Sequence, residues 1–231
     1  MERYLYDIMM KNQIGNVKQC KALIKHGYVV VNDIIIDDQK YKVSAKDRIV
    51  VDGKQINSAP YVYYMMNKPK GYICANHDRN HLCVLDLIDN KDCYCLGRLD
   101  KDTTGLLLLT NDKSLSKRLL LPENHIYKTY FVTLNNILND DLEDIFLKGV
   151  IIDKDIVCKK AYLKRIDDYH CYVTIREGRY HQIKKMFLSC HNEVIELKRI
   201  RFKDLVLDED LKEGQYRSLF NEEIESLYEV G

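Results

Sequence analysis

The stretch GRLDKDTTGLLLLT, residues 97–110, ends in a run of leucines that follows a charged turn. A short run of apolar residues without polar interruption is typical of a strand that is buried on both faces. Gly97 and Gly105 flank the charged part and permit a tight turn or the close approach of another backbone. Residues 106–109 are therefore predicted to form a central strand, with the charged turn at the rim of the core.

The acids of this turn are Asp100 and Asp102. At the rim of a core a carboxylate meets a lower dielectric than in water, and Arg98, Thr103 or Thr104 can orient it. A carboxylate held in this way suits nucleophilic or acid–base catalysis. The alternative is that both acids only cap a turn.

The composition is that of an ordinary globular protein of 231 residues, with 46% hydrophobic and 31% charged residues. This length allows one good core and a small additional domain. No run approaches the roughly 18 apolar residues of a membrane span, and the first residues lack the apolar block of a secretory signal. We therefore expect a cytoplasmic protein without a membrane partner. The net charge of +1 excludes a uniformly basic coat, so an RNA partner would be bound by local patches.

The cysteines are scattered along the chain, and the one close pair, Cys93 and Cys95, is separated by a single residue. Zinc sites usually place two to four residues between such ligands, so reduced and mostly buried thiols are expected, and no metal. A phosphate-binding loop and a dinucleotide fingerprint are also missing, and no cofactor is predicted. The eight cysteines are Cys20, Cys74, Cys83, Cys93, Cys95, Cys158, Cys171 and Cys190.

A small polar run that ends in proline, NSAP at residues 57–60, predicts a boundary between domains 1–59 and 60–231. The first domain contains an amphipathic helix that Asn16 can cap and that Gly27 can end as a left-handed residue. Its lysines share one side of the helix, which indicates either a solvated face or a basic patch. These lysines are Lys18, Lys21 and Lys25.

The second domain mixes strands and helices without strict alternation. Residues 125–134 and 168–177 are rich in aromatic and β-branched residues and are predicted strands. Residues 181–190 have the apolar periodicity of a helix. Strands outnumber helices, and this pattern favours an α+β fold over a doubly wound one.

Further motifs accompany the charged turn in a fixed order: MMNKPKGYIC (65–74), YKTYFVTL (127–134), EGRYHQIKKMF (177–187), VIELKR (194–199) and LKEGQYRSL (211–219). With them the chain resembles, over nearly its whole length, the pseudouridine synthases that modify ribosomal RNA and carry an N-terminal S4 RNA-binding domain. The resemblance implies a small S4 domain and a catalytic domain with a mixed, mostly antiparallel sheet and a central cleft. The threonine pair 103–104, EGRYHQ and the chain length favour the branch that acts on 16S rRNA, of the pseudouridine-516 type.

The resemblance also implies roles for single residues. Asp100 matches the catalytic aspartate, which either attacks the anomeric carbon of the target nucleotide or acts as a base that begins glycal formation. Tyr130 matches the tyrosine that stacks on the flipped base, and Leu197 matches an apolar residue of the uracil pocket. Lys184 occupies the position of a cation that is ion-paired to the aspartate. Arg98 is expected to position the backbone of the substrate or the Asp100 turn.

Other basic residues are expected to contact RNA. Arg179 and Lys185 are assigned to substrate binding, Lys185 as a phosphate contact. The S4 domain here has Asn16-Val17 where relatives usually have a Ser-Arg pair, so its phosphate contacts depend on other side chains. These are Arg3, Lys18, Lys21 and Lys25. His181, whose ordinary pKa would suit a base, is interpreted as structural.

The implied reaction breaks and re-forms a glycosidic bond, so it needs no redox group. The target base has to be flipped out of the RNA at a cost of a few kcal/mol, and stacking on Tyr130, roughly 1–3 kcal/mol, offsets part of this cost. The expected partner is 16S rRNA within a partly assembled small subunit, bound by a monomer. Two alternatives remain open: the same chemistry on 23S rRNA, and a non-catalytic RNA-binding or ribosome-assembly factor.

Overall fold

The computed structural model describes residues 2–58 and 60–229. The chain divides into two compact units, Met1–Tyr61 and Val62–Gly231. The division lies two residues after the domain boundary expected from the sequence, and residue 59, the last of the expected first domain, is outside the described residues. Each unit has its own hydrophobic core and is considered separately.

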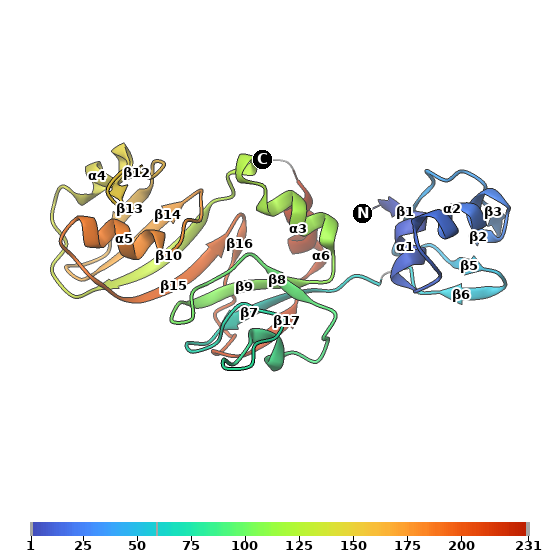
Figure 1. Ribbon diagram of the computed structural model, residues 1–231, viewed down its shortest axis with the longest axis horizontal. Coiled ribbons are helices and arrows are strands. Elements are labelled where there is room, and N and C mark those ends of the chain that lie inside the picture. Colours follow the sequence, from blue (N-terminus) through green and yellow to red (C-terminus); the bar gives the residue numbers. More distant parts are fainter. Residues whose placement is uncertain (1, 59, 230–231) are drawn as a thin grey trace. The chain divides into compact units, whose positions relative to one another are not determined.

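The first unit packs two helices against short antiparallel strands (Figure 1). The helices are α1 (Leu5–Lys11) and α2 (Val17–Lys25). A four-stranded sheet has the order β3-β2-β5-β6, and β1 pairs with β4. The strands are β1 (Glu2–Tyr4), β2 (Val29–Val31), β3 (Ile34–Ile35), β4 (Lys42–Ser44), β5 (Ile49–Val51) and β6 (Lys54–Ile56).

The start and end of α2 follow from its sequence. The Asn16 side chain accepts a hydrogen bond from the Gln19 backbone, and the Gln19 side chain returns one to the Asn16 backbone, which makes a complete capping box. Gly27, with a φ of +75°, follows the C-cap in the left-handed conformation. Both predicted ends of this helix are therefore confirmed.

The second unit is built on one mixed sheet with the order β13-β14-β10-β15-β9-β7-β17 (Figure 1). The β15–β9 pair is parallel, and the other pairs along this path are antiparallel, as expected of a mixed, mostly antiparallel sheet. The strands along the path are β13 (Tyr162–Arg165), β14 (His170–Ile175), β10 (Lys128–Leu134), β15 (Val194–Phe202), β9 (Thr104–Thr110), β7 (Tyr63–Lys68) and β17 (Tyr216–Ser218). The short strands are β8 (Tyr94–Leu96), β11 (Ile151–Ile152), β12 (Ile156–Val157) and β16 (Leu205–Val206).

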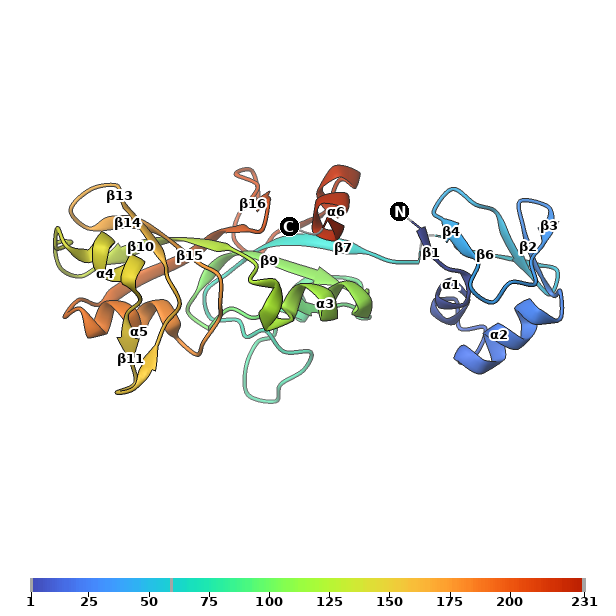
Figure 2. The ribbon, with the colours of Figure 1, turned by 90° about the horizontal axis from the view of Figure 1, so that it is seen from above.

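Helices cover different parts of the two faces of this sheet. α3 (Lys113–Leu120) and α6 (Asn221–Tyr228) pack with alternate leucines of β9, Leu106 and Leu108. The other two leucines belong to the core that includes α4 (Leu142–Lys148) and α5 (Gln182–Ser189). All four leucines are at most 2% exposed, so the predicted burial of this strand on both faces is confirmed. Figure 2 shows α5 and β11 below the strands β10, β14 and β15.

Gly105 allows β9 and β15 to come together. A Cβ atom at this position would lie 2.2 Å from the carbonyl oxygen of Arg199, and φ is +97°, where residues other than glycine are strained. Arg199 is 1% exposed, and its Nε donates a hydrogen bond of 2.7 Å to the Leu106 carbonyl. The close approach predicted at this glycine is therefore present, and it lies directly beside the charged turn.

None of the eight cysteines, all of which lie in the described part of the chain, forms a disulfide, in agreement with the expected reduced thiols. In the described residues no helix is long and apolar enough to cross a membrane.

Candidate active site

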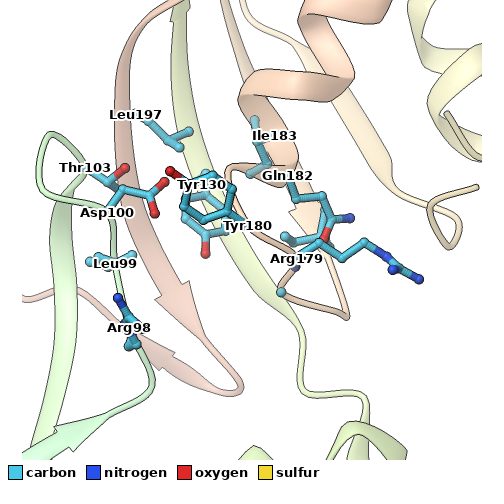
Figure 3. A pocket seen from close by; sticks show the side chains of 12 residues that line it. Arg98, Leu99, Asp100, Thr103, Tyr130, Arg179, Tyr180, Gln182, Ile183 and Leu197 are labelled. Carbon is cyan, nitrogen blue, oxygen red and sulfur yellow. Dashed lines mark hydrogen bonds between the residues drawn. The ribbon is translucent and has the colours of Figure 1, made fainter. Parts of the chain in front are cut away.

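A cavity of about 300 Å³ lies between the charged turn, the sheet and the start of α5 (Figure 3). Its residues come from four separate parts of the second unit: the turn before β9, strands β10 and β15, the end of β14, and the loop that leads into α5. The lining residues are Arg98, Leu99, Asp100, Thr103, Tyr130, Ile175, Gly178, Arg179, Tyr180, Gln182, Ile183 and Leu197. This volume is at the lower end of the range for small-molecule sites and suits a single nucleotide base.

Asp100 lies in the turn that precedes β9, and its side chain is 31% exposed. A backbone hydrogen bond from Thr103 to the Asp100 carbonyl closes the turn. In Figure 3 the carboxyl group of Asp100 points toward Tyr130. The side chain of His181 lies beside it, with Nε2 3.7 Å from Asp100 Oδ1. His181 has a φ of +52° and its ring stacks on Tyr180 at 3.9 Å, so its orientation is fixed.

Tyr130 and Leu197 form part of the apolar wall of the cavity. Each is 7% exposed, and they come from the paired strands β10 and β15, where Tyr130 is opposite Arg199 and Val132 is opposite Leu197. Because directly opposed residues share a face of a sheet, both side chains lie on the face that carries the core. The structure thus places two sequence-predicted residues beside Asp100.

Thr103 adds a polar group to the same wall. The residue is 1% exposed, and its Oγ1 has no hydrogen-bond partner among the described residues. A buried hydroxyl without a partner costs free energy unless a ligand or water satisfies it. Thr103 is therefore suited to bind a polar atom of a molecule in the cavity.

The expected ion pair between Lys184 and Asp100 is wrong. Lys184 Nζ lies 2.5 Å from Asp102 Oδ2 instead, and Lys184 does not line the cavity. The reason is the position of the helix start: α5 directs Ile183 into the cavity, and the next residue is rotated by about 100° toward the more exposed Asp102. Burial raises the pKa of Asp102, but the hydrogen bond and charge of Lys184 outweigh this effect and lower the pKa.

Lys185 also lies outside the cavity lining. Its ammonium group pairs with Asp153 and lies 5.3 Å from the centre of the Tyr180 ring. Arg98 and Arg179, by contrast, line the cavity as expected of substrate-binding residues. Arg179 is held by Glu177, with Nε 3.2 Å from Oε2.

Lys68 was assigned no role from the sequence, yet it anchors the charged turn by hydrogen bonds to its backbone. It is 0% exposed, and its Nζ donates hydrogen bonds to three carbonyl groups, those of Pro69, Lys101 and Thr103, at 3.1, 3.3 and 2.8 Å. Two of these carbonyls flank Asp102, within the turn that carries Asp100. Burial lowers the pKa of Lys68. The signal in the sequence was a lysine directly before proline in the motif NKPKG, at the end of a buried strand.

A thiol pair lies beside the turn. The Leu99 backbone donates a hydrogen bond of 3.3 Å to Cys74 Sγ. The pKa of Cys74 is lowered to about 6, chiefly because the Cys95 thiol donates a hydrogen bond to it, with further contributions from the Leu99 N–H and from the charges of Lys68 and Arg199. The pKa of Cys95 is raised by the same interaction and by burial.

The basic residues proposed for the first unit lie on its surface. Lys18, Lys21 and Lys25 line one shallow depression on the exposed side of α2. Lys21 Nζ lies 4.6 Å from the centre of the Tyr6 ring. Arg3 lies over the ring of Tyr61 at 4.0 Å. The three lysines thus share one face, which the helical spacing predicted.

Fold and site together place a carboxylate, Asp100, and a tyrosine, Tyr130, at one base-sized cavity. Comparison with protein families identifies the class of protein: residues 62–189 match the RNA pseudouridylate synthase model, and residues 14–49 match the S4 domain model. The chain belongs to the RNA pseudouridylate synthase family, whose members are isomerases. Its first unit contains the S4 RNA-binding domain.

Individual relatives agree with this assignment. Ribosomal small subunit pseudouridine synthase A of Yersinia pestis is 40% identical over 96% of this chain and 97% of the relative. The protein of the same name from Escherichia coli strain K12 is 40% identical over 88% of this chain and 90% of the relative. A pseudouridylate synthase crystal structure with 35% sequence identity superimposes with a TM-score of 0.70, covering 96% of this chain and 98% of that chain.

Proposed function

We propose that this protein converts one uridine of the small-subunit ribosomal RNA into pseudouridine, with Asp100 as the catalytic carboxylate. The observation that carries the proposal is the placement of Asp100 in a base-sized cavity with Tyr130 and Leu197. Relatives that are 40% identical over most of their length and are named ribosomal small subunit pseudouridine synthase A support the substrate. The specific target we propose is the uridine at position 516 of 16S rRNA, in a partly assembled subunit in the cytoplasm, modified by a monomer.

The reaction is balanced without another reactant. The bond between N1 of uracil and C1′ of ribose breaks, the base turns, and a bond between C5 and C1′ forms. The proton on C5 is lost and N1 gains one, so nothing is oxidised or reduced. Asp100 starts the process either by attacking C1′ or by removing a sugar proton to form a glycal, and both routes need an ionised carboxylate within reach of the ribose.

The surrounding residues would support these steps. Tyr130 provides an aromatic face for the flipped base, and such stacking, roughly 1–3 kcal/mol, offsets part of the cost of unstacking. The Thr103 hydroxyl can bind a polar edge of uracil. The Lys184–Asp102 ion pair holds the turn on the far side of Asp100, so we assign Lys184 a positioning role. Arg98 and Arg179 at the cavity are suited to phosphate contacts.

The test is an Asp100→Asn variant assayed by tritium release from RNA labelled at C5 of uridine. We expect the variant to bind RNA normally and to form no pseudouridine, because an amide is neither a nucleophile nor a base here. Asp144→Asn is the matched control, since Asp144 is an exposed carboxylate of α4 that does not line the cavity. Measurable turnover by Asp100→Asn would refute the catalytic assignment and favour a non-catalytic assembly factor.

The substrate can be tested separately. Mapping of pseudouridine in both ribosomal RNAs from a deletion strain should show the loss of a single site in 16S rRNA. Restoration by the wild-type gene, but not by the Asp100→Asn variant, links the loss to this site. The loss of a site in 23S rRNA alone would contradict the proposed substrate and leave the chemistry intact.

A further inference from the structure

In the part of the sheet formed by β13, β14, β10 and β15, one face is buried in the core and the opposite face is open to solvent. Residues at alternate positions of β10 and β14 are buried in the core that includes α4 and α5. The residues between them point to the opposite face. There they are half-buried or exposed, with Tyr162 52% and Tyr172 37% exposed.

The exposed face carries a regular row of aromatic and basic side chains. In the sheet register, Lys164 is opposite Tyr172, Tyr172 is opposite Phe131, and Phe131 is opposite Lys198. One residue from each of four strands thus forms a line of Lys, Tyr, Phe and Lys. At about 4.8 Å between strands this line is about 14 Å long.

The aromatic rings of this face are packed against one another. Phe131 lies 6.0 Å from Tyr172 in an edge-on arrangement and 5.4 Å from the ring of His170 in a stacked arrangement. The residues of the neighbouring row are small at the centre, where the hydroxyl groups of Thr129 and Thr174 lie 2.9 Å apart. The rings therefore form a platform whose members contact one another and which is open to solvent.

The charge of the face is positive. Lys164, Lys198 and Arg201 stand on it, with the carboxylates of Glu196 and of Asp167, whose Oδ1 lies 2.8 Å from His170 Nδ1. Among the residues that the structure describes, neither Lys164 nor Lys198 is within ion-pair distance of an acid. These two ammonium groups stand at the ends of the aromatic row, so they are free to bind an anion from solution.

We propose that this platform, defined as Lys164, Tyr172, Phe131 and Lys198, is a second RNA-binding surface that holds an unpaired segment of the substrate RNA away from the catalytic cavity. Bases would stack on Tyr172 and Phe131, and the lysines at both ends would bind phosphates. Proteins that bind single-stranded nucleic acids combine aromatic side chains, on which bases stack, with cations that bind the phosphates. The cavity occupies the other face of the same sheet, because Tyr130 and Leu197 point to the core side.

The positive charge decides in favour of RNA over a protein partner. A protein interface of this size would be expected to have an apolar centre depleted of lysine. Here two unpaired lysines border the rings, and both would lose their hydration without an anionic partner. This inference rests on the proposed RNA-modifying function, because it assigns a further contact to the same substrate.

Photocrosslinking tests the surface directly. The full-length protein is mixed with ribosomal RNA containing 4-thiouridine, irradiated and digested, and crosslinked peptides are identified by mass spectrometry. We expect nucleotides attached to the peptides that contain Phe131 and Tyr172. Crosslinks confined to the cavity and to the S4 domain would overturn the proposal.

Binding by variants gives a second readout. For a short fluorescein-labelled single-stranded RNA, Lys164→Ala/Lys198→Ala should reduce the salt slope of log affinity by about 1.4, which is the loss of two phosphate contacts. Tyr172→Ala should weaken binding roughly tenfold, and Tyr172→Phe should restore it, because the ring is what stacks. The matched control is Lys113→Ala/Lys148→Ala, which removes two exposed lysines of helices α3 and α4.

The result also separates this inference from the proposed function. If wild type forms pseudouridine and the platform variants bind RNA like the control, the platform is not an RNA site, while the enzymatic function stands. If wild type forms no pseudouridine in any ribosomal RNA, the proposed function fails, and the crosslinks alone show whether the platform binds RNA. With the full ribosomal RNA as substrate we expect KM to rise about tenfold in Tyr172→Ala with kcat unchanged.

Discussion

Lys68 shows how a single buried cation can set the position of a catalytic turn. It donates to the carbonyls of Lys101 and Thr103, the first of which also accepts a hydrogen bond of 2.8 Å from the Gly71 N–H. In Lys68→Met we expect the free energy of unfolding to fall by about 1–3 kcal/mol, because buried acceptors lose their donor. Turnover should fall as well, since Asp100 belongs to the same turn.

Urea denaturation and the tritium-release assay measure these two effects. Lys70→Met serves as the control, because Lys70 is an exposed neighbour in the same motif. Full stability and full turnover in Lys68→Met would show that the turn holds its shape without the lysine.

Cys74 is predicted to react as a thiolate at neutral pH. Its pKa is lowered to about 6, because the Cys95 thiol and the Leu99 N–H donate hydrogen bonds to it and two cations lie nearby. Its thiolate fraction therefore rises with pH through 6 and is nearly complete at 7.5. The rate of alkylation of Cys74 by iodoacetamide, followed by mass spectrometry, should have this midpoint.

The buried thiols provide an internal reference. Burial raises the pKa of Cys171 to about 12, so this residue should stay unmodified over the same range. Cys95→Ala removes the strongest donor and should move the Cys74 midpoint upward. A midpoint near the ordinary value of about 8.5 in the wild type would contradict the hydrogen-bond arrangement.

At the residue scale, the motifs predicted which side chains would meet but not every pairing. Asp100, Tyr130 and Leu197 are brought to one cavity, as the sequence indicated. The partner of Lys184 could not be predicted, because it depends on the residue at which α5 starts and on the angle between consecutive helical side chains. His181, interpreted from its motif as structural, lies with its Nε2 3.7 Å from Asp100 Oδ1.

Among the elements, the pairing of β9 with β15 depends on one glycine. A Cβ at Gly105 would lie 2.2 Å from a backbone oxygen that cannot move without shifting the strand. Gly105→Ala should therefore lower the free energy of unfolding by about 3 kcal/mol, from backbone strain and overpacking together. Thermal unfolding followed by circular dichroism is the measurement.

Gly71→Ala separates the effect of backbone strain from that of overpacking. Gly71 also has a positive φ, +91°, but no atom within 4 Å of the added Cβ, so only the strain remains, about 1–2 kcal/mol. Equal losses in the two variants would mean that the close approach of β15 is not a constraint.

The elements themselves were predictable to different degrees. The strand at residues 106–109 and helix α2 were indicated by a continuous apolar run and by a capping residue with a terminal glycine, which are local signals. β1 and α1 were not predicted, since α1 has only seven residues and no side-chain cap. The insertion of β15 between β9 and β10 could not be predicted either, because a pairing between distant segments leaves no local pattern.

For the whole molecule, we expect the first unit to contribute to RNA binding and the second unit to carry out the chemistry. The lysines of α2 lie in the unit without the cavity, so Lys18→Ala/Lys21→Ala/Lys25→Ala should weaken RNA binding and leave kcat unchanged. The salt slope of log affinity should fall by about 2–3, one phosphate contact for each lysine lost. Filter binding at several salt concentrations measures this slope. An unchanged slope would show that these lysines only form a solvated face of the helix.

The order of the strands also has a consequence for synthesis. β15 is the middle strand along the path of the sheet, yet it begins 60 residues after the end of β10 and later still after β9, the two strands that it joins. A nascent chain therefore makes the two flanks first and cannot complete the cavity, which Leu197 lines, until β15 has been synthesised. We therefore expect the second unit to acquire its cavity only after β15 has paired with β9 and β10.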